Sequence, residues 1–168
     1  IIRSIRMVNK RVFKEDPGRL LRAVRLSRRL GFCIDQGTLG EIKANAYLLS
    51  QVSPERVKDE LLGILSLNGV KDSLYCLDSL GLLQHIIPEL RHTVGVTQPE
   101  EHYWNVFEHT IECAGAVERV TSVGDRDLVT RDLLRTDYLS DHLDDVVSDG
   151  HTRRTFLKLA ALFHDIGK

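Results

Sequence analysis

Two observations predict that this sequence folds as an all-α protein. Apolar residues recur at helical spacing from Pro17 almost to the end of the 168-residue chain. The chain also repeats one type of helix start, a capping residue followed by proline, at Asp16-Pro17 and at Ser53-Pro54. Only residues 2–8 alternate apolar and polar side chains, which indicates one short strand near the N-terminus.

The predicted helices follow one another with short connections. The first begins after Asp16 and ends at Gly31, since glycine is a common residue at helix C-termini. Further helices are expected at residues 38–49, 53–65, 69–80, 102–120 and 152–165, with a short element at 81–90. We expect the polar segment 91–101 to be a loop that separates two domains, residues 1–95 and 96–168. The Asp-rich segment 125–149 is expected to be a solvated face or loop.

The composition limits the possible classes of function. The net charge is -1, so any contact with RNA must use a local basic stripe rather than the charge of the whole chain. The three cysteines are odd in number and match no paired spacing, which favours reduced thiols and a cytoplasmic protein. The apolar runs are far shorter than the roughly 18 residues that span a bilayer, so no membrane partner is expected.

A stripe of arginines lies along one side of the first predicted helix. These residues are Arg19, Arg22, Arg25, Arg28 and Arg29, with no acid inside the helix to pair with them. The stripe begins at Glu15-Asp16-x-x-Arg19, where a carboxylate and a guanidinium project from the same turn. Such a pair can accept from and donate to the edge of a nucleotide base. From spacing alone, the alternative is a surface helix in which Asp16 is the N-cap.

Longer segments of the chain carry a resemblance to a known family. The segment Val12–Arg25, VFKEDPGRLLRAVR, resembles the F-x-E-D-P-x-R-x-L-R-A-x-R block of class II tRNA nucleotidyltransferases (CCA-adding enzymes) and bacterial poly(A) polymerases. Leu30–Ile34, Ser53–Leu61 (SPERVKDEL) and Leu82–Leu90 extend the resemblance over nearly the whole chain. The resemblance implies a helical neck and body that contact the tRNA or RNA 3′ end.

The same resemblance implies a role for each residue at the start of the arginine helix. Asp16 and Arg19 would select the incoming CTP or ATP by hydrogen bonds to its base, and Glu15 would hold Arg19. Arg22 and Arg25 would help to hold the nucleotide triphosphate or the RNA end.

The resemblance also implies a catalytic head that this sequence does not contain. In the family, a Gly-Ser loop and an Asp-x-Asp pair that binds Mg²⁺ precede the neck, and neither pattern occurs here. Residues 1–7 look like the last strand that leaves such a head. We therefore expect a fragment of a larger bacterial-type enzyme, with no catalytic residue in the fragment and no transferase activity of its own.

A second cluster combines histidine and aspartate. His109 lies in one predicted helix, and His164-Asp165 follows the apolar run 157–163. The three side chains could share a divalent transition metal, or a histidine and the aspartate could form a structural hydrogen-bonded pair. The segment Ala160–Lys168 resembles the central motif of the HD superfamily of metal-dependent phosphohydrolases, H…HD…D. That resemblance implies His109, His164 and Asp165 as ligands and Lys168 as a possible phosphate contact. Because the closing Asp is missing, we expect weak or no metal binding.

Three functions therefore stay open. The sequence favours a fragment of an RNA 3′-end nucleotidyltransferase, for tRNA CCA addition or poly(A) synthesis, joined to the first helices of an HD-type domain. The first alternative is a metal-dependent phosphohydrolase acting on nucleotides or RNA ends. The second alternative is a non-catalytic helical RNA-binding module.

Overall fold

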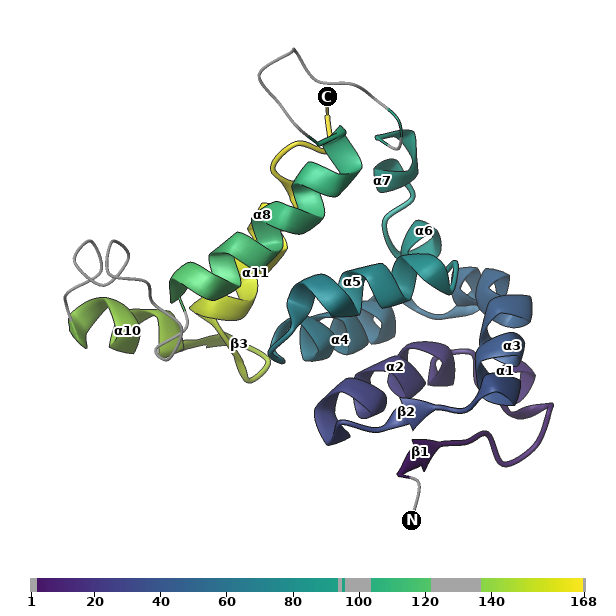
Figure 1. Ribbon diagram of the computed structural model, residues 1–168. Coiled ribbons are helices and arrows are strands. Elements are labelled where there is room, and N and C mark those ends of the chain that lie inside the picture. The colour runs from purple at the N-terminus through teal and green to yellow at the C-terminus, as the bar shows by residue number, and fades with distance from the viewer. Residues whose placement is uncertain (1–2, 94, 96–103, 122–136, 168) are drawn as a thin grey trace.

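The computed structural model describes residues 3–93, 95, 104–121 and 137–167. This part of the chain is mostly helical and contains two small sheets of two strands each (Figure 1). The predicted predominance of helices is therefore confirmed, but the prediction of a single short strand is wrong. Among the described residues, no helix has the length and apolar character needed to cross a membrane.

The N-terminal strand is part of a sheet within the chain rather than an isolated remnant. Strand β1 (Ser4–Ile5) pairs in parallel with β2 (Cys33–Ile34). Between them lie the short helix α1 (Val12–Glu15) and the arginine-rich helix α2 (Arg19–Leu30). Helix α2 ends at Gly31, which adopts φ 63°, a left-handed conformation that glycine takes without steric cost.

Helices form most of the remaining structure (Figure 1). Helix α3 (Gln36–Asn45) is capped by the Asp35 side chain, which accepts from the Gly37 N–H. The elements that follow are the 3-10 helix η1 (Ala46–Gln51), α4 (Pro54–Leu65), α5 (Val70–Ser79), α6 (Leu83–Ile86), α7 (Glu89–His92) and α8 (Val106–Thr121). The last elements are α10 (Asp137–Asp144), β3 (Val146–Ser148), β4 (His151–Thr152) and α11 (Arg153–Phe163). The described half of the Asp-rich segment is thus a helix and a hairpin strand with mostly exposed side chains, which fits a solvated face rather than a loop.

One hydrophobic core joins the two halves of the chain. Leu21 of α2, Ile64 of α4 and Leu74 of α5 are completely buried in it. The same core includes Ile111 of α8 and Leu162 of α11, and these two helices pack against each other and against α5 and α4. The apolar contacts therefore continue across position 95, where the sequence predicts a domain boundary.

Two charged side chains reinforce this junction. The Glu118 carboxylate of α8 accepts from the backbone N–H groups of Gly69 and Val70, at 2.7 and 2.8 Å, and so satisfies the start of α5. Lys158 of α11 is 2% exposed, and its Nζ donates to the carbonyl oxygens of Leu65 and Leu67. Helices α8 and α11 are therefore tied to the connection between α4 and α5.

Candidate functional site

Asp16 and Arg19 lie together in the turn that leads into α2. Arg19 Nε is 3.5 Å from Asp16 Oδ2. Asp16 Oδ1 accepts from the Gly18 N–H at 3.2 Å, and the Asp16 carbonyl oxygen accepts from the Arg19 N–H. The N-cap of α2 is Gly18, so the predicted N-cap role of Asp16 is wrong by two positions, because Pro17 and Gly18 form a turn before the helix. Asp16 stabilises that turn instead.

A second arginine, which sequence reasoning did not assign to the site, reaches the same carboxylate. Arg56 Nη2, from the first turn of α4, lies 2.7 Å from Asp16 Oδ1. This hydrogen bond is the main cause that lowers the pKa of Asp16 below 3.8, against the opposing effect of burial. The carboxylate is therefore charged at neutral pH. The two residues are 40 positions apart, so no local spacing indicates the contact.

Glu15 is not among the ion pairs described at the start of α2. Glu15 is exposed at the end of α1, and the acidic side chain beside Arg19 is that of Asp16. No ion pair between Glu15 and Arg19 is present in the described part of the chain, and the role of Glu15 stays a prediction.

Arg22 and Arg25 contact an acidic residue of another helix. The buried Glu60 of α4 accepts a hydrogen bond on each of its two carboxylate oxygens. Arg22 Nε donates to one oxygen at 3.1 Å, and Arg25 Nε donates to the other at 2.6 Å. The Arg22 side chain remains 46% exposed, and that of Arg25 is 24% exposed. These two arginines therefore hold α2 against α4, while Arg22 also keeps an accessible face.

An apolar hollow adjoins the start of the arginine stripe. Its volume is about 350 Å³, and it lies between the β1 segment and α2. Arg19 and Arg22 line it together with apolar side chains that include Met7, Val12 and Phe13. A flat apolar ligand with a polar edge could lie here with that edge against Arg19.

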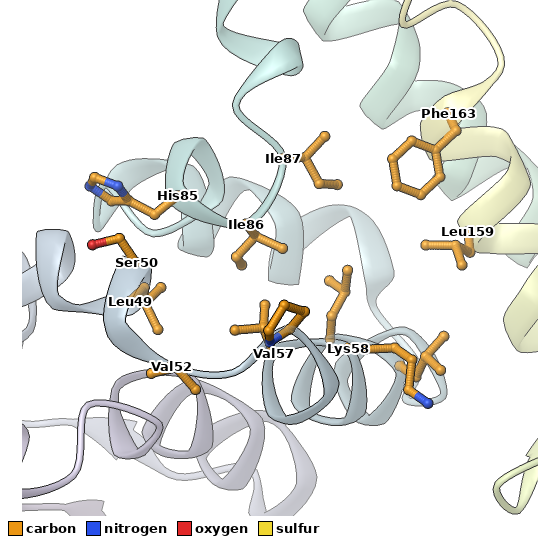
Figure 2. A pocket seen from close by; sticks show the side chains of 13 residues that line it. Leu49, Ser50, Val52, Val57, Lys58, His85, Ile86, Ile87, Leu159 and Phe163 are labelled. Atoms are coloured by element: carbon orange, nitrogen blue, oxygen red, sulfur yellow. The ribbon is translucent and has the colours of Figure 1, made fainter.

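A second cavity, shown in Figure 2, has a different character. Its volume is about 390 Å³, and it is formed by η1, α4, α6 and α11. Figure 2 shows Ile86 and Ile87 on one side and Leu159 and Phe163 of α11 on the other. Its lining residues are mostly apolar and include no carboxylate.

The structure brings His109, His164 and Asp165 together at the ends of α8 and α11. His109 Nε2 lies 3.2 Å from His164 Nε2 and 3.6 Å from Asp165 Oδ2, and His164 Nε2 lies 3.3 Å from Asp165 Oδ2. Asp165 is 7% exposed. Lys168, the predicted phosphate contact, lies outside the described residues.

The chemistry of these donors fits a divalent metal. His164 Nδ1 donates to the Ala161 carbonyl oxygen at 2.8 Å, so in the neutral ring Nε2 carries the lone pair that binds metals. A metal at about 2.0–2.2 Å from each ligand needs donor atoms about 3.0–3.5 Å apart. The observed triangle is close to these values.

Sequence comparisons find proteins that are similar to most of this chain. Residues 31–93 match the family described as "Probable RNA and SrmB- binding site of polymerase A". The chain is 34% identical over 134 residues to the A-adding tRNA nucleotidyltransferase of Deinococcus radiodurans, covering 77% of this chain and 30% of that protein. It is 39% identical over 89 residues to the CCA-adding enzyme of Limosilactobacillus reuteri, covering 51% of this chain and 21% of that protein. The chain thus spans less than a third of these relatives.

Solved structures share the fold. A tRNA nucleotidyltransferase complexed with a primer tRNA and an incoming ATP analog aligns with a TM-score of 0.63 at 22% identity, over 96% of this chain and 38% of that one. A tRNA-processing enzyme in apo form I aligns with a TM-score of 0.62 at 20% identity, over 98% of this chain and 36% of that one. The chain is therefore similar to tRNA nucleotidyltransferases in sequence, over 77% of its length in the first of these relatives, and it shares their fold.

Proposed function

We propose that this chain supplies base recognition to an RNA 3′-end nucleotidyltransferase that uses CTP, ATP or both. The observation that carries the proposal is the pairing of Asp16 and Arg19 at 3.5 Å. Cytosine and adenine each present an exocyclic amine beside a ring acceptor. The Asp16 carboxylate would accept from the amine, and the Arg19 guanidinium would donate to the ring acceptor.

The surroundings of the pair support binding of a base. The apolar hollow beside Arg19 offers a surface for the ring, which hydrogen bonds alone would not hold in water. The accessible face of Arg22 would contact the triphosphate or the RNA end, and Arg25 would keep it in place through Glu60. Glu15 would help to hold Arg19 for this contact.

The catalytic chemistry would come from elsewhere in a longer protein. The alignments cover only 30% and 21% of the two relatives named above. We propose that a head domain outside this sequence holds Mg²⁺ and that this chain alone is inactive. Since relatives are named A-adding, CC-adding and CCA-adding, the same neck is compatible with more than one product.

The test uses a full-length protein that carries this sequence. It is incubated with Mg²⁺, a tRNA transcript lacking its 3′ CCA, and labelled CTP or ATP, separately and together. Addition of C residues, of A, or of both in order would support the proposal and identify the product, whereas a run of A would indicate poly(A) synthesis. Asp16→Ala should reduce discrimination between CTP and ATP. Asp59→Ala, an exposed aspartate of α4, is the matched control. No incorporation of either nucleotide would contradict the proposal.

The triangle of His109, His164 and Asp165 favours a second activity in the same protein. We propose that residues 96–168 begin an HD-type domain, following a neck and body at 1–95, and that these three side chains bind a divalent transition metal. Such a metal would lower the pKa of a bound water and supply hydroxide for attack at phosphorus. Asp165 would contribute negative charge from a buried position, and the Ala161 carbonyl would keep the His164 ring oriented. Lys168 would contact the phosphate.

The second activity is tested with the same full-length protein. Metal content is measured after purification, and hydrolysis of cyclic phosphodiesters and phosphomonoesters is followed with added Mn²⁺, Co²⁺ or Ni²⁺. His164→Ala should abolish hydrolysis without changing nucleotide addition, and His85→Ala serves as the control. Hydrolysis that survives His164→Ala would exclude this site.

A further inference from the structure

The two oxygens of the Asp16 carboxylate have different surroundings. Oδ1 accepts from Arg56 Nη2 at 2.7 Å and from the Gly18 N–H at 3.2 Å. Within the described part of the chain, Oδ2 has only the longer contact of 3.5 Å with Arg19 Nε. One oxygen is therefore anchored, and the other lies beside Arg19 with hydrogen-bonding capacity remaining.

Arg56 reaches this carboxylate from a helix that is itself fixed to α2. Glu60, one turn further along α4, holds Arg22 and Arg25 of α2 with both of its oxygens. The backbone of α4 near Arg56 is therefore held at a fixed distance from the turn that contains Asp16. The contact between Arg56 and Asp16 follows from this packing, although the Arg56 side chain is 50% exposed.

Gly18 leaves the space that the Arg56 guanidinium occupies. Its φ is −59°, which any residue adopts, so the backbone does not require glycine here. A Cβ at this position would lie 2.8 Å from Arg56 Nη2 and 3.2 Å from Arg56 Cζ. The first of these distances is shorter than real Cβ contacts allow. A side chain on Gly18 would therefore displace the guanidinium from Asp16.

We propose that Arg56 is a positioning residue for nucleotide selection, which holds Asp16 Oδ1 so that Oδ2 faces the base beside Arg19. The inference rests on the proposed base-reading role of Asp16. The terminal torsion of an aspartate side chain is broad, so an unanchored carboxylate samples many orientations. Without Arg56, the acceptor that distinguishes one base from another would lose its fixed direction, whereas contacts to the triphosphate would be unaffected.

The experiment compares variants of a full-length protein that carries this sequence. The ratio of kcat/KM for the correct nucleotide to that for the wrong one is measured on one tRNA 3′ end. Arg56→Ala should lower this ratio at least about fivefold, because a hydrogen-bonding site that is disordered discriminates poorly. Gly18→Ala should act in the same direction although it removes no charge. Arg56→Lys should retain part of the discrimination, and Lys58→Ala, on the same helix, should leave it unchanged.

Asp16→Ala separates the inference from the proposal on which it depends. If Asp16→Ala lowers discrimination and Arg56→Ala adds nothing in that background, Arg56 acts through Asp16, as proposed. If Asp16→Ala lowers discrimination and Arg56→Ala alone does not, the positioning role is refuted while base reading stands. An equal loss of kcat/KM for both nucleotides in Arg56→Ala would show a structural role and also refute it. If Asp16→Ala leaves discrimination intact, base reading fails, and the role of Arg56 fails with it.

Discussion

The buried Lys158 side chain of α11 donates to the carbonyl oxygen of Leu65, the last residue of α4, at 3.0 Å. The same ammonium group donates to Leu67 and lies 3.8 Å from the Glu118 carboxylate of α8. Since Glu118 also satisfies the first N–H groups of α5, one lysine links the C-terminus of one helix to the N-terminus of the next. This linkage fixes the C-terminal helices on the body.

Replacing Lys158 by methionine should therefore destabilise the chain. The substitution keeps an apolar stem of similar length but leaves the carbonyl oxygens of Leu65 and Leu67 without their donor in a buried place. We expect a loss of about 2–4 kcal/mol in the free energy of unfolding. Urea denaturation followed by circular dichroism measures it. Arg153→Met, an exposed position on the same helix, should change stability by less than about 0.5 kcal/mol. Equal stabilities of the two variants would contradict this role of Lys158.

Local patterns in the sequence predict most of the helices but not the small sheets. The Pro54 start of α4 and the Gly31 end of α2 are at the predicted positions, because capping and chain reversal depend on neighbouring residues. The alternation of residues 2–8 indicates β1, but its partner β2 has only two residues, which are too few to show alternation, so the pairing of Ser4 with Cys33 is not predicted. Helix α10 escapes prediction because its many aspartates resemble a solvated loop.

The contacts between neighbouring residues of the candidate site can be predicted from the sequence, whereas the contacts between helices cannot. Asp16 and Arg19 share one turn, and His164 adjoins Asp165, so sequence spacing alone suggests both pairs. The partners from α4 cannot be found in this way. Glu60 and Arg56 meet residues that are 35 to 40 positions away, and only tertiary packing brings them together.

The Glu60 contact predicts that this residue matters more for stability than its neighbour. Glu60→Ala would leave Arg22 and Arg25 without their shared partner and remove a buried side chain. Because both arginines are partly exposed, we expect a moderate loss of about 1–3 kcal/mol. Asp59→Ala, which removes a 62%-exposed carboxylate from the same turn, should change stability by less than about 0.5 kcal/mol. Chemical denaturation of both variants provides the comparison, and a loss confined to Asp59→Ala would contradict the assignment.

Two helical glycines should respond differently to alanine. Gly40 lies inside α3, and the position that a Cβ would take there is open space, so Gly40→Ala should stabilise the chain by about 0.5–1 kcal/mol through helix propensity. At Gly63 of α4 a Cβ would lie 2.6 Å from Arg25 Cδ, which would push Arg25 away from Glu60. Gly63→Ala should therefore be less stable than Gly40→Ala by about 1–2 kcal/mol. Thermal unfolding of the pair measures the difference, and equal shifts in Tm would show that Arg25 is not displaced.

The Asp16 carboxyl should titrate below its ordinary pKa of 3.8, chiefly because Arg56 donates a hydrogen bond to it. The charged form is favoured in the folded state, so its contribution to stability is present above pH 3.8 and is lost as the pH falls through the lowered pKa. Arg56→Ala should raise this pKa toward 3.8. Carboxyl carbon chemical shifts of labelled aspartate, followed from about pH 2 to about pH 6, measure the change. Lys58→Ala is the control, and an Asp16 pKa that is the same with and without Arg56 would contradict the contact.

Metal binding by the chain itself should depend on His109, His164 and Asp165 together. The three donor atoms lie within 4.8 Å of one another, and the His164 ring is oriented by the Ala161 carbonyl oxygen. With only three protein ligands in the described cluster, we expect weak binding of Co²⁺ or Mn²⁺. His164→Ala and Asp165→Asn should each lower the affinity at least about tenfold, since the first removes a ligand and the second removes the negative charge of another. Isothermal titration measures the affinities, with His151→Ala as the control because His151 lies on β4, outside this cluster. If His151→Ala weakens binding as much as His164→Ala does, the metal binds elsewhere.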